Sequence, residues 1–425
     1  MKVLMFGWEF PPHISGGLGT ASYGLTKGLA SEGVEILFVM PKAMGDEDSS
    51  IGKIINASDV EMPTSIEGNE EFWKNVEFLA VNSGLVPYLG IEQYDELFNE
   101  ESGVNKSEGF THLGGKYSFS GKYGANLMEE VTRYAMVAAS IAQQYDFDII
   151  HAHDWLTYLA GIVAKRISGK PLVIHVHATE FDRSGENVNR TVYDLERLGM
   201  AEADAVMAVS NLTRNIVIQR YGIDESKVFT VHNAVDFSGR KEVESDRTIK
   251  NKVVTFLGRI TFQKGPEYFI EAANKVLKKM PNVHFVMAGS GDMMNRMVRR
   301  VGRLGIGSKF HFTGFLKGDE VNQMYARSDV YVMPSVSEPF GISPLEAMRT
   351  GVPVIISKQS GVAEVLKHAF KINFWDVDAM ADAIYGLLAY PTLSNTLSKN
   401  GMKEVNSLSW EDTARIVKSI YQRFA

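Results

Sequence analysis

Short, almost continuously apolar segments alternate with longer segments of helical periodicity, and this alternation occurs twice along the 425-residue chain. The first series comprises residues 2–6 and 34–40, followed by "FDIIHAH", "PLVIHVHA", "DAVMAVS" and "KVFTVHN". The second series comprises "VVTFLGR", "VHFVMAG", "KFHFTG", "VYVMPS" and "VPVIIS". Apolar strands separated by helices are typical of a parallel sheet that is covered on both faces. We therefore expect an α/β protein with two doubly wound, Rossmann-like domains facing a central cleft.

The boundaries of these domains follow from the segments that interrupt the alternation. Residues 238–250 are polar and charged, as linkers are, so we expect an N-terminal domain at 1–237 and a second domain at 251–405. Residues 44–125 are rich in glycine, serine and acidic side chains, and we expect them to be surface insertions with some local structure.

The composition excludes several classes of protein. A hydrophobic content of 45% with 22% charged residues indicates a globular chain, and a net charge of −7 argues against a nucleic-acid surface. The absence of cysteine excludes disulfides, thiolate metal sites and a cysteine nucleophile. With neither a signal-peptide pattern nor an apolar run of about 18 residues, we expect a cytoplasmic protein without a transmembrane segment.

Glycines follow the first expected strand in "ISGGLGTAS", where the chain turns into a helix. Gly16 and Gly17 would let an anionic ligand approach the backbone and the free N–H groups of the helix start. A plain strand-to-helix turn is the alternative. The pattern differs from GxGxxG, which argues against a dehydrogenase.

Two cations follow the first strand of the second domain, in "LGRITFQKG". Arg259 offers a planar fork of donors and Lys264 a mobile ammonium, and such a pair on one loop suits a diphosphate. The alternative is that both are ordinary surface charges.

Four histidines occupy the ends of two neighbouring strands, in "HAHDW" and "HVHATEFDR". The spacing of His151 from His153, and of His175 from His177, places each pair on one face of its strand. Three interpretations remain open for them: buried hydrogen-bonded histidines, one active-site histidine, or a metal site.

Two carboxylates lie eight positions apart in "VSEPFGISPLEAM". Ser343 and Glu346 have the spacing of a capping box, with Pro344 at the first helical position. Glu338 has no such structural reason, and it precedes the amides of Phe340–Ile342 in a loop expected at the cleft. We expect Glu338 to bind neutral hydroxyls beside a diphosphate, which describes a nucleotide sugar.

Together these motifs resemble the donor-binding signature of retaining GT-B glycosyltransferases of the glycogen and starch synthase-like group. The resemblance extends to "GGLG", "VSNLTRNIV" and "VHNAVD", and it covers nearly the whole chain except residues 44–125. It implies the GT-B fold, in which residues 406–425 form a helix that packs back on the first domain. It also implies transfer of glucose from a nucleotide-glucose donor to an acceptor hydroxyl with retention of configuration.

The resemblance assigns roles to individual residues. Arg259 and Lys264 would hold the diphosphate and neutralise the charge on the leaving nucleotide. Glu338 would bind the transferred sugar. His177 would lie near the 6-hydroxyl of the sugar. The residues that would bind the donor are Gly16, Gly17, Phe340, Gly341, Ile342 and Glu346, the last at the ribose. Those on the sugar and acceptor side would be Glu9, Asp154 and Asn233.

The donor base and the acceptor remain open. Glycogen synthases that use ADP-glucose carry a lysine where this chain has Ile14, so ADP-, UDP- and GDP-glucose are all retained as donors. We expect an α-1,4-glucan as acceptor. A small-molecule, sucrose-related or lipid-linked acceptor is the alternative. Residues 44–125 would decide between the two, since the resemblance implies that acceptor specificity lies in the first domain; these residues are either a solvated excursion or a wall on the acceptor side. We expect no metal and no other cofactor, and the sequence predicts no particular oligomeric state.

Overall fold

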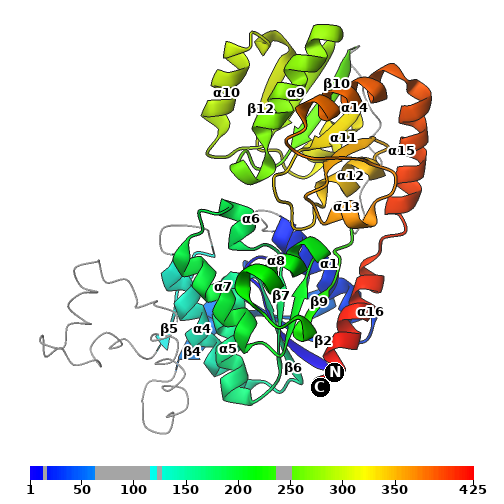
Figure 1. The fold of residues 1–425 in the computed structure, drawn as a ribbon. Coiled ribbons are helices and arrows are strands. Elements are labelled where there is room, and N and C mark those ends of the chain that lie inside the picture. The colour runs from blue at the N-terminus through cyan, green and yellow to red at the C-terminus, as the bar shows by residue number, and fades with distance from the viewer. Residues whose placement is uncertain (13–16, 63–114, 122–126, 236–250) are drawn as a thin grey trace, which may run out of the picture.

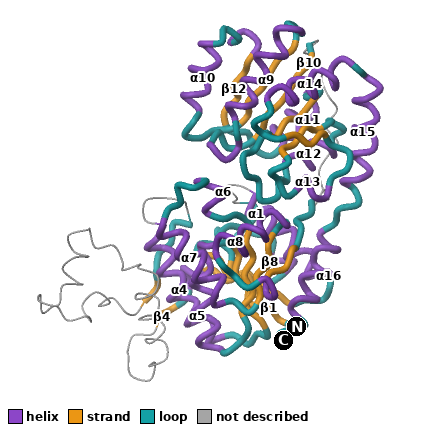
Figure 2. The backbone as a smooth tube through the Cα atoms, in the orientation of Figure 1, coloured by secondary structure: helices purple, strands orange, loops and turns teal. Residues whose placement is uncertain are grey.

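A computed structural model describes residues 1–12, 17–62, 115–121, 127–235 and 251–425, which form two lobes (Figure 1). Each lobe is an open sheet with helices on both faces, as Figure 2 shows. This architecture confirms the expected pair of doubly wound α/β domains. The expected linker at 238–250 and residues 13–16, which include Gly16, lie outside the described residues.

The N-terminal sheet has seven parallel strands in the order β3-β2-β1-β6-β7-β8-β9. These strands are β1 (Lys2–Phe6), β2 (Glu35–Met40), β3 (Lys53–Asn56), β6 (Ile149–His153), β7 (Leu172–Val176), β8 (Ala205–Ala208) and β9 (Val228–Thr230). A separate antiparallel pair consists of β4 (Glu61–Met62) and β5 (Gly115–Lys116). Within the interruption at 44–125, the described residues thus supply an edge strand, β3, and this small pair.

Helices cover both faces of the N-terminal sheet. They are α1 (Gly17–Ser31), α4 (Leu127–Gln144), α5 (Trp155–Ser168), α6 (Glu180–Ser184), α7 (Arg190–Glu202) and α8 (Asn211–Tyr221). Leu4 and Phe6 of β1 enter the core beneath α4 and α5, whereas Val3 and Met5 enter the core beneath α1. Successive side chains point to opposite faces, so a strand buried on both faces is apolar throughout, which explains the unbroken "KVLMF" pattern.

The C-terminal sheet has six parallel strands in the order β12-β11-β10-β13-β14-β15. They are β10 (Lys252–Leu257), β11 (Val283–Ala288), β12 (Phe310–Gly314), β13 (Val330–Met333), β14 (Val354–Ser357) and β15 (Phe370–Ile372); β15 was not anticipated. The helices are α9 (Pro266–Lys279), α10 (Met294–Arg303), α11 (Asp319–Arg327), α12 (Ser343–Arg349), α13 (Val362–Val365), α14 (Val377–Ala389) and α15 (Pro391–Val405).

The last helix, α16 (Trp410–Tyr421), returns to the N-terminal lobe and packs against α1 (Figure 1). Contact is close because α1 carries a glycine there: a Cβ on Gly28 would lie 2.5 Å from the carbonyl oxygen of Trp410. Lys418 Nζ also donates to the carbonyl of Glu32 at 2.5 Å. This is the packing expected for the final segment. Among the helices in the described ranges, none combines the length and hydropathy needed to cross a membrane.

Candidate active site

The two lobes meet through loops that follow the carboxyl ends of their strands. Ser337, after β13, donates to the carboxylate of Asp182, which lies in α6 just beyond β7. Glu364 in α13 accepts the backbone N–H groups of Asn211 and Leu212 at 2.8 Å each, at the start of α8 (Figure 1). Open α/β sheets bind ligands at these strand ends, so the junction is the expected place for a site.

At this junction the structure joins two of the predicted site residues. Lys264 Nζ lies 2.5 Å from Oε2 of Glu338, and the hydroxyl of Ser335 donates to the same oxygen at 3.0 Å. Lys264 follows β10 and Glu338 follows β13, and these strands are neighbours in the sheet. Because parallel neighbours end at the same edge, residues distant in the chain are brought into contact.

Arg259 lies on the same loop as Lys264 but is exposed, and its contact with Gln263 is long, 3.5 Å from Nη2 to Oε1. The loop is held against the end of β11, where a Cβ on Gly289 would lie 1.9 Å from the carbonyl oxygen of Gly258. Gly289 also has φ of 138°, which L side chains rarely adopt. The small residues of "AGSGD" therefore allow two loops to pack backbone against backbone.

The loop after Glu338 carries backbone donors. Val362 donates to the carbonyl of Phe340 at 2.7 Å, which fixes the loop to α13. Gly341 has φ of 102°, and a Cβ there would lie 3.1 Å from Cγ of Glu338. Within the described part of the chain, the amides of Phe340, Gly341 and Ile342 donate no hydrogen bond. They are therefore available to oxygens of a ligand.

The expected capping box is wrong. Helix α12 begins at Ser343 with Ile342 as its N-cap, and no side chain caps it. The hydroxyl of Ser343 instead accepts a 2.8 Å hydrogen bond from Tyr331, whose buried phenol needs a partner. Burial raises the pKa of Tyr331, the hydrogen bond with Ser343 opposes this rise, and the charges of Glu338 and Glu346 add to it.

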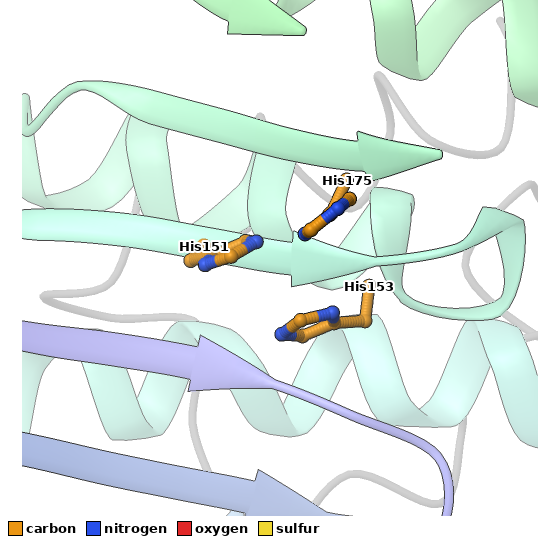
Figure 3. Close-up of side chains that lie close together, drawn as sticks. All are labelled: His151, His153 and His175. Atoms are coloured by element: carbon orange, nitrogen blue, oxygen red, sulfur yellow. The ribbon is translucent and has the colours of Figure 1, made fainter. Parts of the chain in front are cut away.

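The four histidines share one face of β6 and β7, and their rings form a stack. Figure 3 shows three of them, His151, His153 and His175. Centroids lie 4.2 Å apart for His151 and His153, and 4.4 Å apart for His175 and His177. The side chains of His151, His153 and His175 are fully buried, whereas that of His177, one residue past β7, is half-buried. Burial lowers the pKa of His177 to about 3, so its ring is neutral at physiological pH.

The same cluster offers enough donors to hold a metal: one nitrogen each from His151, His153 and His175 lie within 4.8 Å of one another. The rings are stacked, however, with interplanar angles between 16° and 25°. An imidazole lone pair lies in the plane of its ring, so stacked rings direct their lone pairs along nearly parallel planes. His151 Nδ1 is also hydrogen-bonded to the hydroxyl of Tyr421, at 2.5 Å. Nε2 of His151, Nε2 of His153 and both ring nitrogens of His175 are buried without a hydrogen-bond partner among the described residues.

Asp154 adopts a backbone conformation that costs energy. Its φ of 63° and ψ of 167° lie in a region occupied almost only by glycine, at a cost of about 1–3 kcal/mol. The buried carboxylate accepts from the amide of Ala178 at 3.4 Å. Burial raises the pKa of Asp154 to about 6, although Arg183 opposes the rise. Asp154 thus holds the loop that contains His177.

The other predicted residues occupy the same strand ends. Glu9 is buried after β1, and Asn233 is buried after β9. Oδ1 of Asn233 has no hydrogen-bond partner among the described residues, which leaves an acceptor for a ligand. Gly17, the first residue of α1, is exposed, and a Cβ there would meet nothing within 4 Å.

Sequence reasoning missed contacts that connect the predicted residues. His153 Nδ1 lies 2.9 Å from His177 Nε2, and Ser335 holds Glu338. Both had a local signal, because the strand alternation of "HAH" and the spacing of "SVSE" place them near the predicted residues. The contacts that Asp182 and Glu364 make between the lobes had no local sequence signal, because they depend on how the lobes meet.

The chain matches two protein families that together span most of its length. Residues 2–231 match the family described as "Starch synthase catalytic domain", and residues 240–404 match "Glycosyl transferases group 1".

Relatives extend the match to the whole chain. An uncharacterised glycosyltransferase of Methanocaldococcus jannaschii is 28% identical, covering 99% of this chain and 98% of that protein. Glycogen synthase of Mycobacterium tuberculosis is 22% identical, covering 99% and 94%. The structure of sucrose-phosphate synthase from Thermosynechococcus elongatus shares the fold, with a TM-score of 0.71 and 18% identity, covering 99% and 98%. The chain therefore belongs to the starch synthase catalytic domain family and is a GT-B glycosyltransferase of the glycogen and starch synthase type.

Proposed function

We propose that this enzyme transfers glucose, with retention of configuration, from a nucleotide-glucose donor to a hydroxyl of an α-1,4-glucan. The observation that carries the proposal is the Lys264–Glu338 pair beside the backbone amides of Phe340–Ile342, which donate no hydrogen bond within the described ranges. The similarity to a glycogen synthase over 99% of the chain supports a glucan as the acceptor.

The site places cations for the diphosphate of a nucleotide sugar next to a carboxylate for the hydroxyls of its sugar. Arg259 and Lys264 are suited to the diphosphate, and they neutralise the charge that develops as the nucleotide leaves. The carboxylate of Glu338 accepts hydrogen bonds from hydroxyls of glucose, while the amides of Phe340–Ile342 bind its oxygens and the phosphate. Glu346 binds the ribose.

Retention requires the new bond to form on the face from which the nucleotide departs. Retaining glycosidases achieve this with a carboxylate nucleophile about 5 Å from a second carboxyl. Glu338 is instead paired with Lys264 and Ser335, which suits a residue that orients the sugar. In the proposed step the bond from C1 to the diphosphate breaks, the acceptor oxygen bonds to C1, and its proton passes to the leaving phosphate. No metal or other cofactor enters this scheme.

A second acceptor class is supported by the similarity in fold to sucrose-phosphate synthase, which covers 99% of this chain. Ile14, in place of the lysine of ADP-glucose-dependent glycogen synthases, also sets this sequence apart from them. The second candidate is therefore transfer of glucose to a small sugar acceptor.

The test measures release of nucleoside diphosphate from ADP-, UDP- and GDP-glucose. Each donor is offered with glycogen, with maltooligosaccharides, with small sugars and sugar phosphates, and without an acceptor. Every assay is run with and without a chelator. We expect glycogen-dependent release of one nucleoside diphosphate, and a product that α-1,4-specific amylase degrades. Turnover with small sugars alone would favour the second candidate. A wild-type enzyme that hydrolyses or transfers none of these donors would contradict the proposal.

A further inference from the structure

A hydrogen bond joins the half-buried His177 to a fully buried histidine on the neighbouring strand. His153 Nδ1 lies 2.9 Å from His177 Nε2. His153 is the last residue of β6, and its backbone is paired with His175 of β7, two residues before His177. Both side chains point to the same face of the sheet, so the contact follows from strand pairing.

The surroundings of His153 decide which of the two rings carries the proton in this bond. Burial keeps the pKa of both rings well below the usual value, so each is neutral and carries one proton. Nε2 of His153 is buried and has no partner among the described residues. If His177 donated the hydrogen bond, the proton of His153 would lie on this Nε2 as an orphaned buried N–H.

The arrangement in which His153 donates and His177 accepts costs less free energy. When His153 donates from Nδ1, its Nε2 carries only a lone pair, and buried acceptors without partners are better tolerated than buried donors. His177 then accepts at Nε2 and must carry its own proton on Nδ1. Within the described ranges, Nδ1 of His177 makes no protein hydrogen bond, and the side chain is half-buried at the strand end.

The ring of His153 is held in place by its neighbours. It stacks between His151 at 4.2 Å and His177 at 5.2 Å, measured between centroids. His151 is anchored by the hydroxyl of Tyr421 in α16. A buried ring in such a stack cannot turn freely, so the direction of its Nδ1 is fixed.

We infer that His153 is a positioning residue that fixes His177 as the neutral Nδ1–H tautomer, so that His177 presents an N–H donor to a hydroxyl of the transferred sugar. This inference rests on the proposed function for the ligand and on the structure alone for the tautomer. It gives His153 a part in sugar recognition without contact with the substrate.

Two variants separate the hydrogen bond from the stack. His153→Phe keeps a stacked ring and removes the donor. His175→Phe is its matched control, because His175 is equally buried and stacks on His177 at 4.4 Å, but its ring nitrogens have no hydrogen-bond partner among the described residues. His153→Asn supplies an amide N–H near the position of Nδ1 and serves as the conservative rescue.

The first readout is the tautomer of His177 in the enzyme without substrate, measured by ¹⁵N shifts of labelled imidazoles and assigned with a His177 variant. We expect a protonated Nδ1 in the wild type, in His175→Phe and in His153→Asn, and a shift toward Nε2–H in His153→Phe. A wild-type His177 protonated on Nε2, or one unaffected by His153→Phe, would overturn the inference. This measurement needs no turnover, so it stands apart from any failure of the proposed function.

The second readout is kinetic. Loss of one neutral hydrogen bond corresponds to roughly a tenfold fall in kcat/KM for the donor in His153→Phe. We expect His175→Phe to stay within about twofold of wild type and His153→Asn to recover most of the loss. With donor analogues that each lack one hydroxyl, the defect of His153→Phe should vanish for the analogue missing the recognised group. An equal defect with every analogue, or an equal loss in His175→Phe, would assign His153 a structural role only.

Discussion

Lys264 and Glu338 are 74 positions apart in the chain, yet Nζ of the first lies 2.5 Å from Oε2 of the second. Their side chains retain only 21% and 8% of their exposure. The cation proposed for the diphosphate is therefore held by the carboxylate proposed for the sugar. A bound donor has to share Lys264 with Glu338, so the pair couples recognition of the two halves of the donor.

Substitution of Glu338 should separate binding from turnover. In Glu338→Gln the ammonium of Lys264 loses its charged partner and is more available to phosphate, so nucleoside diphosphate should bind as tightly as in wild type or more tightly. Turnover should fall about 10- to 100-fold, because hydrogen bonds to a charged group are worth about 1.5–3 kcal/mol. Titration calorimetry and steady-state kinetics measure the two effects. Ser335→Ala, which removes one hydrogen bond from Glu338, should cause a smaller loss, and near-normal turnover in Glu338→Gln would refute the assignment.

Asp154 should show a conflict between stability and activity. Asp154→Gly relieves the backbone strain, whereas Asp154→Ala retains it, and both remove the carboxylate that holds the loop after β7. We expect the glycine variant to be more stable than the alanine variant by about 1–3 kcal/mol, while both lose activity to a similar extent. Thermal unfolding and transfer assays provide the comparison. Equal stability of the two variants would show that the conformation costs nothing here.

Glu364 should contribute pH-dependent stability to the junction of the lobes. Burial raises its pKa, but hydrogen bonds from His232 and from the amides of Asn211 and Leu212 outweigh this, so the pKa is lowered overall. A lowered carboxyl pKa stabilises the fold above the unfolded value of 4.5, and the contribution is lost as pH falls through the folded value. Glu364→Gln should therefore reduce Tm by roughly 1–2 °C at pH 7, after allowance for solvent screening, and by progressively less as pH falls below 4.5 and through the folded value.

Glu404→Gln is the matched control for this effect. Glu404 likewise accepts two backbone amides, those of Lys367 and His368, but within one lobe. Both variants should lower Tm at pH 7, whereas only Glu364→Gln should change KM for the donor. An unchanged KM in that variant would show that the junction plays no part in donor binding.

Docking of α16 should depend on the glycine that faces it. A Cβ at Gly28 would approach a backbone oxygen of Trp410 to 2.5 Å, and backbone cannot move aside easily. We expect Gly28→Ala to lose about 1–3 kcal/mol of stability and to expose residues 406–425 to proteolysis. Gly302→Ala in α10 is the control: nothing lies within 4 Å, so it should gain up to about 1 kcal/mol. Wild-type protease resistance in Gly28→Ala would contradict the account.

The sequence by itself determined most of the strands and helices and their division between two parallel sheets. Strands buried on both faces are apolar throughout, as in "KVLMF", and this local pattern needs no tertiary information to be read. The motifs also placed Lys264 and Glu338 at strand ends. The edge strands β3 and β15 escaped prediction, because they have only four and three residues and each includes a lysine.

Only the tertiary structure decided which partner each side chain takes. Lys264 meets Glu338 because β10 and β13 are neighbours, an order that the chain sequence does not show. The spacing of Ser343 in the sequence predicted that its hydroxyl caps a helix. In the structure this hydroxyl instead accepts a hydrogen bond from the buried phenol of Tyr331. The proton proposed for His177 Nδ1 likewise depends on a buried ring on the next strand. Spacing fixes what a residue can do locally, whereas burial and strand order fix which of the competing partners lies within reach.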